Sequence, residues 1–183
     1  MKLELNDFEY NDLVEDILAN KEFRKLENFI HHKTDRLEHS KRVSLYSYKI
    51  CKMLKLDYVS AARGGLLHDF FFDKYQGKSS TSLMKNHPKI ALRNAKKYFK
   101  INKIEANIIE SHMYPLNIRC KPKYAESYVV STIDKISCLY EKSIGYTNEI
   151  CFKVGKTAIY MFLFLFSWLL FLLFIQHRLN FLV

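Results

Sequence analysis

Glycine, proline and cysteine are all scarce in this chain of 183 residues, which contains 5 Gly, 3 Pro and 4 Cys. So few turn-forming residues argue against a sandwich or barrel with many tight turns. The cysteines form no Cys-x-x-Cys pair and are too few for a disulfide framework, so we interpret them as reduced thiols in a cytosolic domain. No sustained alternation of apolar and polar residues predicts a half-buried strand.

Acidic residues are also in deficit. The chain has 19 Asp and Glu against 29 Lys and Arg, for a formal net charge of +10. This excess favours anionic partners, namely phosphorylated small molecules, nucleic acid or an anionic membrane face, although a merely solvated basic surface is the common alternative. There is no arginine-rich run and no aromatic RNA-binding motif, so we expect no nucleic-acid partner.

One stretch lacks charge altogether, residues 158–175, which read AIYMFLFLFSWLLFLLFI. As a helix it would span about 27 Å, close to the hydrocarbon core of a bilayer at about 30 Å. It is apolar on every face, and the alternative is a buried central helix of a soluble bundle. Basic residues before the stretch outnumber the single Arg178 after it, which favours a cytoplasmic main domain. We therefore predict a single-pass protein of the cell membrane, anchored by this helix.

The rest of the chain reads as helices separated by short connections. Asn6 or Asp7 can cap the first helix, and Asp57 the fourth. The pair Gly64-Gly65 would weaken an isolated helix, so we expect it to pack closely against a neighbour. A loop is predicted over 73–86, after which Asn86 as cap and Pro88 in the first turn begin a new helix. The expected helices are 7–19, 21–30, 37–54, 58–70, 86–99, 102–113 and 124–140. The spacing of apolar residues places Phe8 on the buried side of the first helix, and Met53 and Leu54 on that of the third.

Four of the seven histidines and two aspartates stand in separate local contexts, EHSKRV, GLLHDF, NHPKIA, ESHMYP and STIDKIS. The residues are His39, His68, Asp69, His87, His112 and Asp134. A lone histidine on a helix is more often structural, but here several lie on different helices. Neutral imidazole together with carboxylate suits Fe, Mn or Zn ions. No single helix can surround a metal, so ligands drawn from several helices are what a site in a bundle core requires.

The order His, His-Asp, His, His, Asp resembles the HD-domain metal-dependent phosphohydrolase superfamily. The wording GLLHD, NHPKIA and STIDKIS is similar to bacterial two-metal members, among them hydrolases that split diadenosine tetraphosphate symmetrically. The resemblance covers about residues 39–139 and implies an all-α helical bundle, here followed by one C-terminal transmembrane helix. We accordingly divide the chain into an N-terminal helical segment, the HD domain, a linker, the transmembrane helix and a short tail. Their ranges are 1–30, 31–145, 146–157, 158–175 and 176–183.

The resemblance also implies how two divalent ions would be held. The first ion would be bound by four of these residues, His39, His68, Asp69 and Asp134. Asp69 would bridge to the second ion, which His87 and His112 would complete. A metal-activated hydroxide would then attack phosphorus in a nucleotide or other phosphoester, with His68 and Asp69 at the catalytic centre. Arg42, one turn after His39, could donate to a substrate phosphate, or could equally form a surface ion pair.

One position departs from the pattern of the relatives. Many of them have a lysine three residues after the Asp of the pair, where this chain has Phe72 and a lysine only at Lys74. The departure leaves open whether Lys74 replaces that phosphate contact. It also leaves a second hypothesis open, in which the chain is a non-catalytic membrane-anchored HD module for ligand sensing or protein interaction. The substrate, the native metal and the oligomeric state are not determined by the sequence.

Overall fold

The structure, a computed structural model, describes residues 7–31, 34–72 and 80–143. Within these ranges the chain is helical apart from one small ladder of two-residue strands, so the predicted all-α class is confirmed there. The helices are α1 (Phe8–Ala19), α2 (Lys21–Arg24), the 3-10 helix η1 (Lys25–Asn28), α3 (Arg36–Met53), α4 (Tyr58–Leu67), α5 (Ser80–Tyr98), α6 (Lys103–Ser111) and α7 (Ala125–Ser143). The antiparallel strands are β1 (Ile30–His31) and β2 (Thr34–Asp35).

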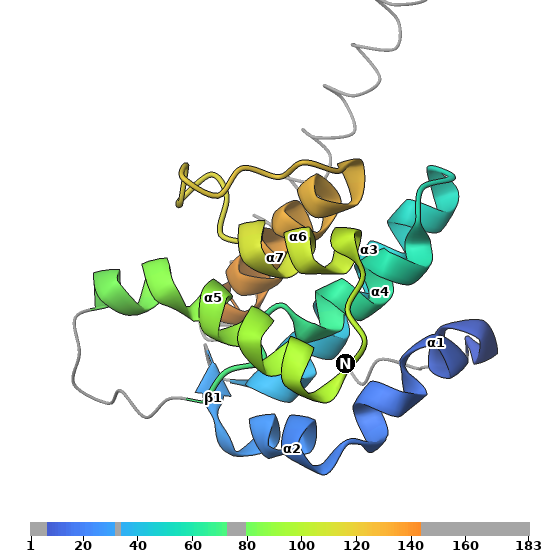
Figure 1. Cartoon of the computed structure of the whole chain (residues 1–183), viewed down its shortest axis with the longest axis horizontal. Coiled ribbons are helices and arrows are strands. Elements are labelled where there is room, and N and C mark those ends of the chain that lie inside the picture. Colours follow the sequence, from blue (N-terminus) through green and yellow to red (C-terminus); the bar gives the residue numbers. More distant parts are fainter. Residues whose placement is uncertain (1–6, 32–33, 73–79, 144–183) are drawn as a thin grey trace, which may run out of the picture. The chain divides into compact units, whose positions relative to one another are not determined.

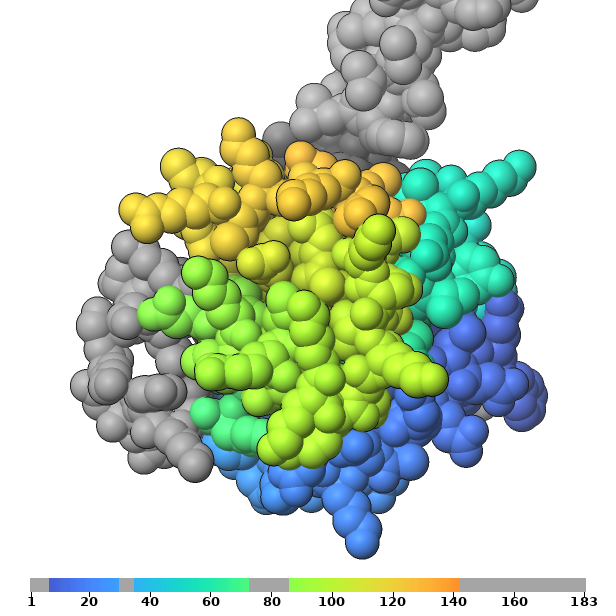
Figure 2. Space-filling view, viewed as in Figure 1, coloured from blue at the N-terminus to red at the C-terminus, as the bar shows by residue number. Residues whose placement is uncertain are grey.

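Helix α4 lies at the centre of the unit that carries these elements. It packs against α3, α6 and α1. The blue N-terminal helices α1 and α2 lie along one side in Figure 1, and the yellow to orange helices α6 and α7 lie along the other. Side chains of α5 and α6 form much of the face turned toward the viewer in Figure 2. Helices that precede α4 in the chain and a helix that follows it therefore both pack against it.

Two helices begin at a predicted cap, α1 at Asp7 and α4 at Asp57, and α6 begins at a cap that was not predicted, Asn102. The side chains of Asp7, Asp57 and Asn102 each accept a hydrogen bond from the backbone N–H three residues further on. At α6 the side chain of Glu105 also accepts from the N–H of Asn102, which completes a capping box. These caps satisfy N–H groups that have no partner within their helices.

The glycine pair of α4 packs closely, as predicted. A Cβ atom built on Gly64 would lie 2.9 Å from two side-chain carbons of Ile108 in α6. One built on Gly65 would lie 3.2 Å from the Cα of Ser44 in α3. The absent side chains let α4 approach both neighbours, which brings the end of α4 close to α3 and α6.

The predicted buried side of two helices is partly wrong. Phe8, expected to be buried in α1, is 86% exposed, whereas Tyr10 is fully buried. At the end of α3, Met53 and Leu54 were expected in the core but are 72% and 53% exposed. Helix α3 instead buries a row of small polar residues, namely Ser40, Ser44 and Ser47. Small side chains permit the close approach of α4, and the Ser44 hydroxyl donates to the carbonyl of Ala62 there.

The predicted start of the fifth helix is also wrong. Helix α5 begins at Ser80, so the predicted loop is helical from that residue and Pro88 lies inside the helix. An interior proline costs about 3 kcal/mol because it removes a backbone hydrogen bond. Packing offsets this cost, because His87, Ala91 and Ala95 are buried along one side of the helix. The preceding residues, 73–79, lie outside the described ranges.

Other boundaries differ by a turn or less from the predicted ones, except for the second helix, where α2 ends at Arg24 and η1 follows. The chain divides into two units, Met1–Glu141 and Lys142–Val183. The predicted linker, transmembrane helix and tail, residues 146–183, lie outside the described ranges. Among the residues that are described, no helix is long and apolar enough to cross a membrane.

Candidate metal centre

The structure brings all six predicted metal ligands together in the interior, and none is more than 7% exposed. His39 comes from α3 and Asp134 from α7. His68 and Asp69 follow directly after α4, His112 follows α6, and His87 lies in α5. Five helices thus supply the ligands, as a site in a bundle core requires.

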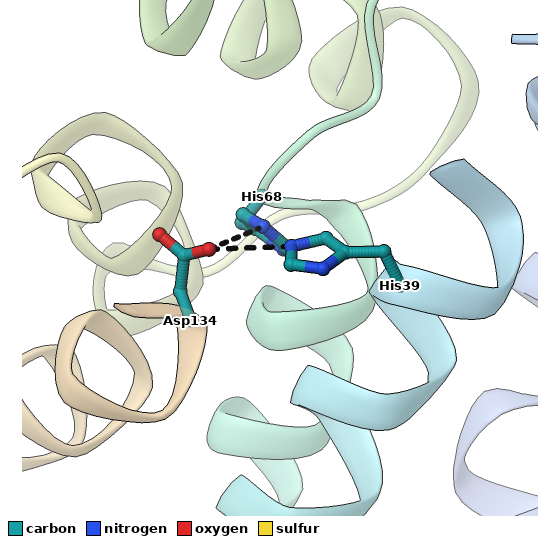
Figure 3. A group of neighbouring side chains, drawn as sticks. All are labelled: His39, His68 and Asp134. Atoms are coloured by element: carbon teal, nitrogen blue, oxygen red, sulfur yellow. Dashed lines mark hydrogen bonds and ion pairs between the residues drawn. The ribbon is translucent and has the colours of Figure 1, made fainter. Parts of the chain in front are cut away.

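Three of these side chains converge on one point (Figure 3). Asp134 Oδ1 lies 3.2 Å from Nε2 of His39 and 3.7 Å from Nε2 of His68. One ligand atom from each of the three residues lies within 4.8 Å of the others. Two imidazole nitrogens and one carboxylate oxygen at this spacing are a donor set that can bind a divalent cation.

A second group of donors lies on the other side of Asp69. Nε2 of His87 and Nε2 of His112 are 2.9 Å apart. The two nitrogens are close enough that one divalent ion would be held by both. His68, Asp69 and His112 also offer one ligand atom each within 4.8 Å of one another.

The carboxylate of Asp69 faces both groups. Its Oδ1 lies 3.3 Å from Nε2 of His87 and 3.5 Å from Nε2 of His112. Its Oδ2 lies 3.8 Å from Nε2 of His68. The two oxygens of one side chain are therefore turned toward two sets of nitrogens, which is the arrangement that a bridging ligand needs.

Helix ends fix the orientation of two of the imidazoles. Nδ1 of His68 donates to the carbonyl of Gly65 at 2.7 Å, and Nδ1 of His112 donates to the carbonyl of Ile109 at 2.8 Å. Each carbonyl is one that the end of a helix leaves without an N–H partner. Because a carbonyl can only accept, Nδ1 carries the hydrogen and the neutral ring presents the lone pair of Nε2 to the centre. Helix α4 ends at Leu67, before the predicted Phe70.

The donors fit a cation, because two of them lack a hydrogen bond within the described part of the chain. Nε2 of His68 and Oδ1 of Asp69 are buried and form no hydrogen bond of ordinary geometry with the described part of the chain. Buried polar atoms nearly always have a partner, and each specific exception needs an explanation. A cation between these atoms would satisfy both of them. The donor chemistry and the vacant lone pairs therefore both suit a divalent metal.

Burial and mutual proximity alter the protonation of the site. Burial, together with neighbouring histidines, lowers the pKa of His68 and holds the pKa of His112 well below its usual range. Burial would raise the pKa of Asp69 and Asp134, but the surrounding histidines outweigh it and hold both pKa values well below normal. Burial opposes the charged form of His39, yet its hydrogen bonds to Asp134 and Glu141 raise its pKa to about 9.

We expect the free energy of unfolding of the metal-free chain to fall on both sides of neutral pH. His68 and His112 stay neutral in the fold, whereas the unfolded chain binds protons on them near pH 6.5, so stability declines as pH falls below that value. His39 acts in the opposite sense: its stabilisation is complete below pH 6.5 and is lost as pH rises to about 9. Urea unfolding with chelator present, between about pH 5 and 9, measures both limbs.

His39→Gln is the matched variant for this experiment. It is expected to remove the part of the decline between pH 6.5 and about 9 and to keep the acid limb. A free energy of unfolding that does not change from pH 7 to pH 5 would contradict the assignment of neutral, buried His68 and His112.

The guanidinium of Arg42 forms an ion pair with the carboxylate of Glu141. Its Nη1 donates to Oε1 of Glu141, and its guanidinium carbon lies 5.4 Å from the centre of the Tyr140 ring. Of the two roles considered for Arg42, an ion pair is therefore present, although it is largely buried instead of lying on the surface. A contact of Arg42 with phosphate remains a prediction.

Phe72, the residue that departs from the relatives' pattern, packs against other aromatic side chains. The ring of Phe72 lies 5.7 Å from the ring of Phe29 and 5.7 Å from that of Phe70, centre to centre. Phe72 therefore belongs to an aromatic cluster beside the core and offers no donor to a phosphate. Lys74 lies outside the described residues.

Two residues beside the centre were not predicted. Glu141 Oε1 lies 2.9 Å from Nδ1 of His39, and Lys135 Nζ donates to Asp134 Oδ2 at 2.8 Å and to the carbonyl of His112. Glu141 follows Asp134 by two helical turns, so helix periodicity could have indicated it. For Lys135 the sequence holds no comparable indication.

Comparison with known proteins gives one match. A family model for the HD domain matches residues 36–139. The matched stretch begins with the first residue of α3 and includes all six residues of the candidate metal centre. None of the curated proteins compared with the chain matches it, and none of the solved structures does.

Proposed function

Because the chain belongs to the HD domain family of metal-dependent phosphohydrolases, we propose that it hydrolyses a phosphorylated small molecule, a nucleotide or another phosphoester or phosphoanhydride, with two divalent ions. The observation that carries the proposal is the carboxylate of Asp69, whose two oxygens face two separate sets of histidine nitrogens. One ion would be held by His39, His68, Asp69 and Asp134. The other would be held by Asp69, His87 and His112.

Two Fe, Mn or Zn ions, when bound, supply an activated water and offset charge on the phosphoryl group. The protonation states of the donor side chains suit the binding of these ions. Asp69 and Asp134 have lowered pKa values and are ionised, and the neutral rings of His68 and His112 present lone pairs. Lys135 fixes the second oxygen of Asp134. The donors therefore need little rearrangement when the ions bind.

The choice of substrates to test follows from charge and motif. The net charge of +10 favours an anionic substrate. The sequence motifs GLLHD and NHPKIA are similar to those of hydrolases that split diadenosine tetraphosphate. Dinucleoside polyphosphates are therefore the first class of substrate to assay. Phe72 offers no donor where many relatives have lysine, so a substrate bound by different phosphate contacts is included in the panel.

The experiment is a panel of dinucleoside polyphosphates, deoxynucleoside triphosphates, cyclic nucleotides and nucleoside monophosphates, assayed with Mn²⁺, Fe²⁺ and Zn²⁺. Release of phosphate or of a nucleotide that depends on metal and is lost with chelator supports the proposal. A folded, metal-loaded protein that hydrolyses nothing in the panel would instead support the non-catalytic module for ligand sensing or protein interaction.

We also propose that residues 158–175 anchor the protein in the cell membrane, with the HD domain in the cytoplasm. The supporting observation is the uncharged run itself, preceded by Lys153 and Lys156, which can meet anionic headgroups. Each leucine or phenylalanine near the centre of such a span favours insertion by about 0.3 to 0.6 kcal/mol.

Ending the chain at Thr157 is expected to release a protein that no longer sediments with membranes and that keeps its metals and activity. All six proposed ligands precede this position by more than a helical turn. Membrane fractionation and metal analysis of the full and shortened chains measure the effect. Aggregation of the shortened chain, or loss of its helical circular dichroism, would show that the segment is part of a core and would contradict the anchor.

A further inference from the structure

Glu141 is a buried carboxylate for which the proposed metal ligands leave no role. Its side chain is 0% exposed, and its Oε1 lies 2.9 Å from Nδ1 of His39. The other nitrogen of the same ring, Nε2, lies 3.2 Å from Oδ1 of Asp134. The imidazole of His39 is thus held between two carboxylates, one at each nitrogen.

Both carboxylates come from α7. Glu141 follows Asp134 by seven residues, about two helical turns, so the two side chains project from the same face of the helix. One helix therefore provides a metal-facing carboxylate and, two turns later, a carboxylate behind the histidine. This spacing along α7 places one carboxylate oxygen at each of the two nitrogens of the imidazole ring.

A third residue holds Glu141 in place. Arg42 lies one turn after His39 on α3, and its Nη1 donates to the same Oε1 that faces the histidine. The arginine side chain is 13% exposed. Its charge offsets the cost of burying the carboxylate, which is large for a carboxylate without a partner.

We propose that Glu141 is a positioning residue for His39, and that Arg42 positions Glu141. The inference rests on the proposed metal centre and concerns only its first ion. Glu141 accepts the hydrogen of Nδ1, so Nε2 is the nitrogen that gives up its proton when the ion binds, and the plane of the ring is fixed. His68 and His112 obtain the same tautomer from backbone carbonyls, whereas His39 obtains it from a side chain. A carboxylate behind a metal-binding histidine also raises the basicity of the ligand.

The test is titration of the metal-free, full-length chain with Co²⁺, followed by its visible absorption and by competition with a chelator. Removing a group behind a ligand weakens metal binding by about 10- to 100-fold. We expect Glu141→Ala to weaken the first Co²⁺ by that amount, to change its absorption spectrum and to leave the affinity of the second Co²⁺ within a few-fold. Glu141→Gln keeps an oxygen that can accept from Nδ1 and is expected to recover part of the loss.

Glu126→Gln is the matched control. Glu126 is also a buried glutamate on α7, but it accepts from the backbone N–H of Asp57 and is absent from the metal centre. It should bind both Co²⁺ ions as the unaltered chain does. Equal weakening in the Glu126 and Glu141 variants would mean that any change in α7 packing affects the site, and would overturn the inference.

Two further results separate this inference from the proposed function. If Glu141→Ala binds Co²⁺ with unaltered affinity and spectrum, the positioning role is wrong while the metal centre stands. If the unaltered chain binds no Co²⁺, the metal centre itself is wrong, and the inference fails with it.

Arg42→Gln tests the last part of the arrangement. We expect a smaller weakening of the first Co²⁺ than in Glu141→Ala, because Glu141 keeps its contact with His39 but loses the group that holds it. An unchanged Co²⁺ affinity combined with a raised KM for substrate would overturn this part, and would place Arg42 on the substrate phosphate instead.

Discussion

Replacing Asp69 by alanine is expected to lower the rate of hydrolysis by about a thousandfold or more while leaving the helices largely intact. The side chain turns one oxygen toward His68 and the other toward His87 and His112, and a methyl group can replace neither. Metal ions contribute several kcal/mol to stabilising a phosphoryl transition state, and about 4 kcal/mol corresponds to a thousandfold in rate. The measurement is the steady-state rate on the best substrate of the panel, together with metal content and circular dichroism.

Two other variants make this result specific. Asp69→Asn keeps the size of the side chain but loses its charge, so it should lose most of the activity as well. Asp12→Ala, on the exposed side of α1, should behave as the unaltered protein. Unaltered turnover by Asp69→Ala with both metals still bound would contradict the role of Asp69 as the ligand shared by two ions.

The histidine variants are expected to fall into two classes by metal content. His87 makes its metal-site contacts with His112 and with Oδ1 of Asp69. His87→Ala should therefore empty the second position and leave His39, His68 and Asp134 as a group that still binds one ion. His112→Ala should act in the same way, whereas His39→Ala or His68→Ala should remove the first ion.

Elemental analysis of the four purified variants gives metal ions per chain directly. Loss of the first ion is expected to abolish activity, because the proposed hydrolysis needs both ions. Since His68 also lies near Asp69 and His112, its variant is expected to be the most severe of the four. Equal loss of metal in all four would mean that the two positions are not separate.

The sequence predicted the ligands and the helical class, for different reasons. The six ligand residues were identified from their order and wording, which resemble a family of proteins, and the structure brings them together. The helices were predicted from local features, and Asp7 and Asp57 form the expected caps because a cap depends on neighbouring residues alone.

The errors come from contacts between distant parts of the chain. Helix α3 buries Ser44 because Gly65 of α4 lies against it, and no periodicity within α3 reveals that neighbour. Pro88 lies inside α5 because buried Ala91 and Ala95 outweigh its local preference for a first turn. Periodicity places Glu141 on the same face of α7 as Asp134, but its contact with His39 joins residues 102 positions apart and is not visible in the sequence.

The most direct test of the metal centre is the metal content of the full-length protein, purified without chelator and measured by elemental analysis beside Asp69→Ala. The arrangement of Asp69 between two sets of histidines predicts about two Fe, Mn or Zn ions per chain in the unaltered protein, and fewer in the variant. A folded, helical protein that contains no divalent metal, and takes up none when Mn²⁺, Fe²⁺ or Zn²⁺ is added, would contradict it.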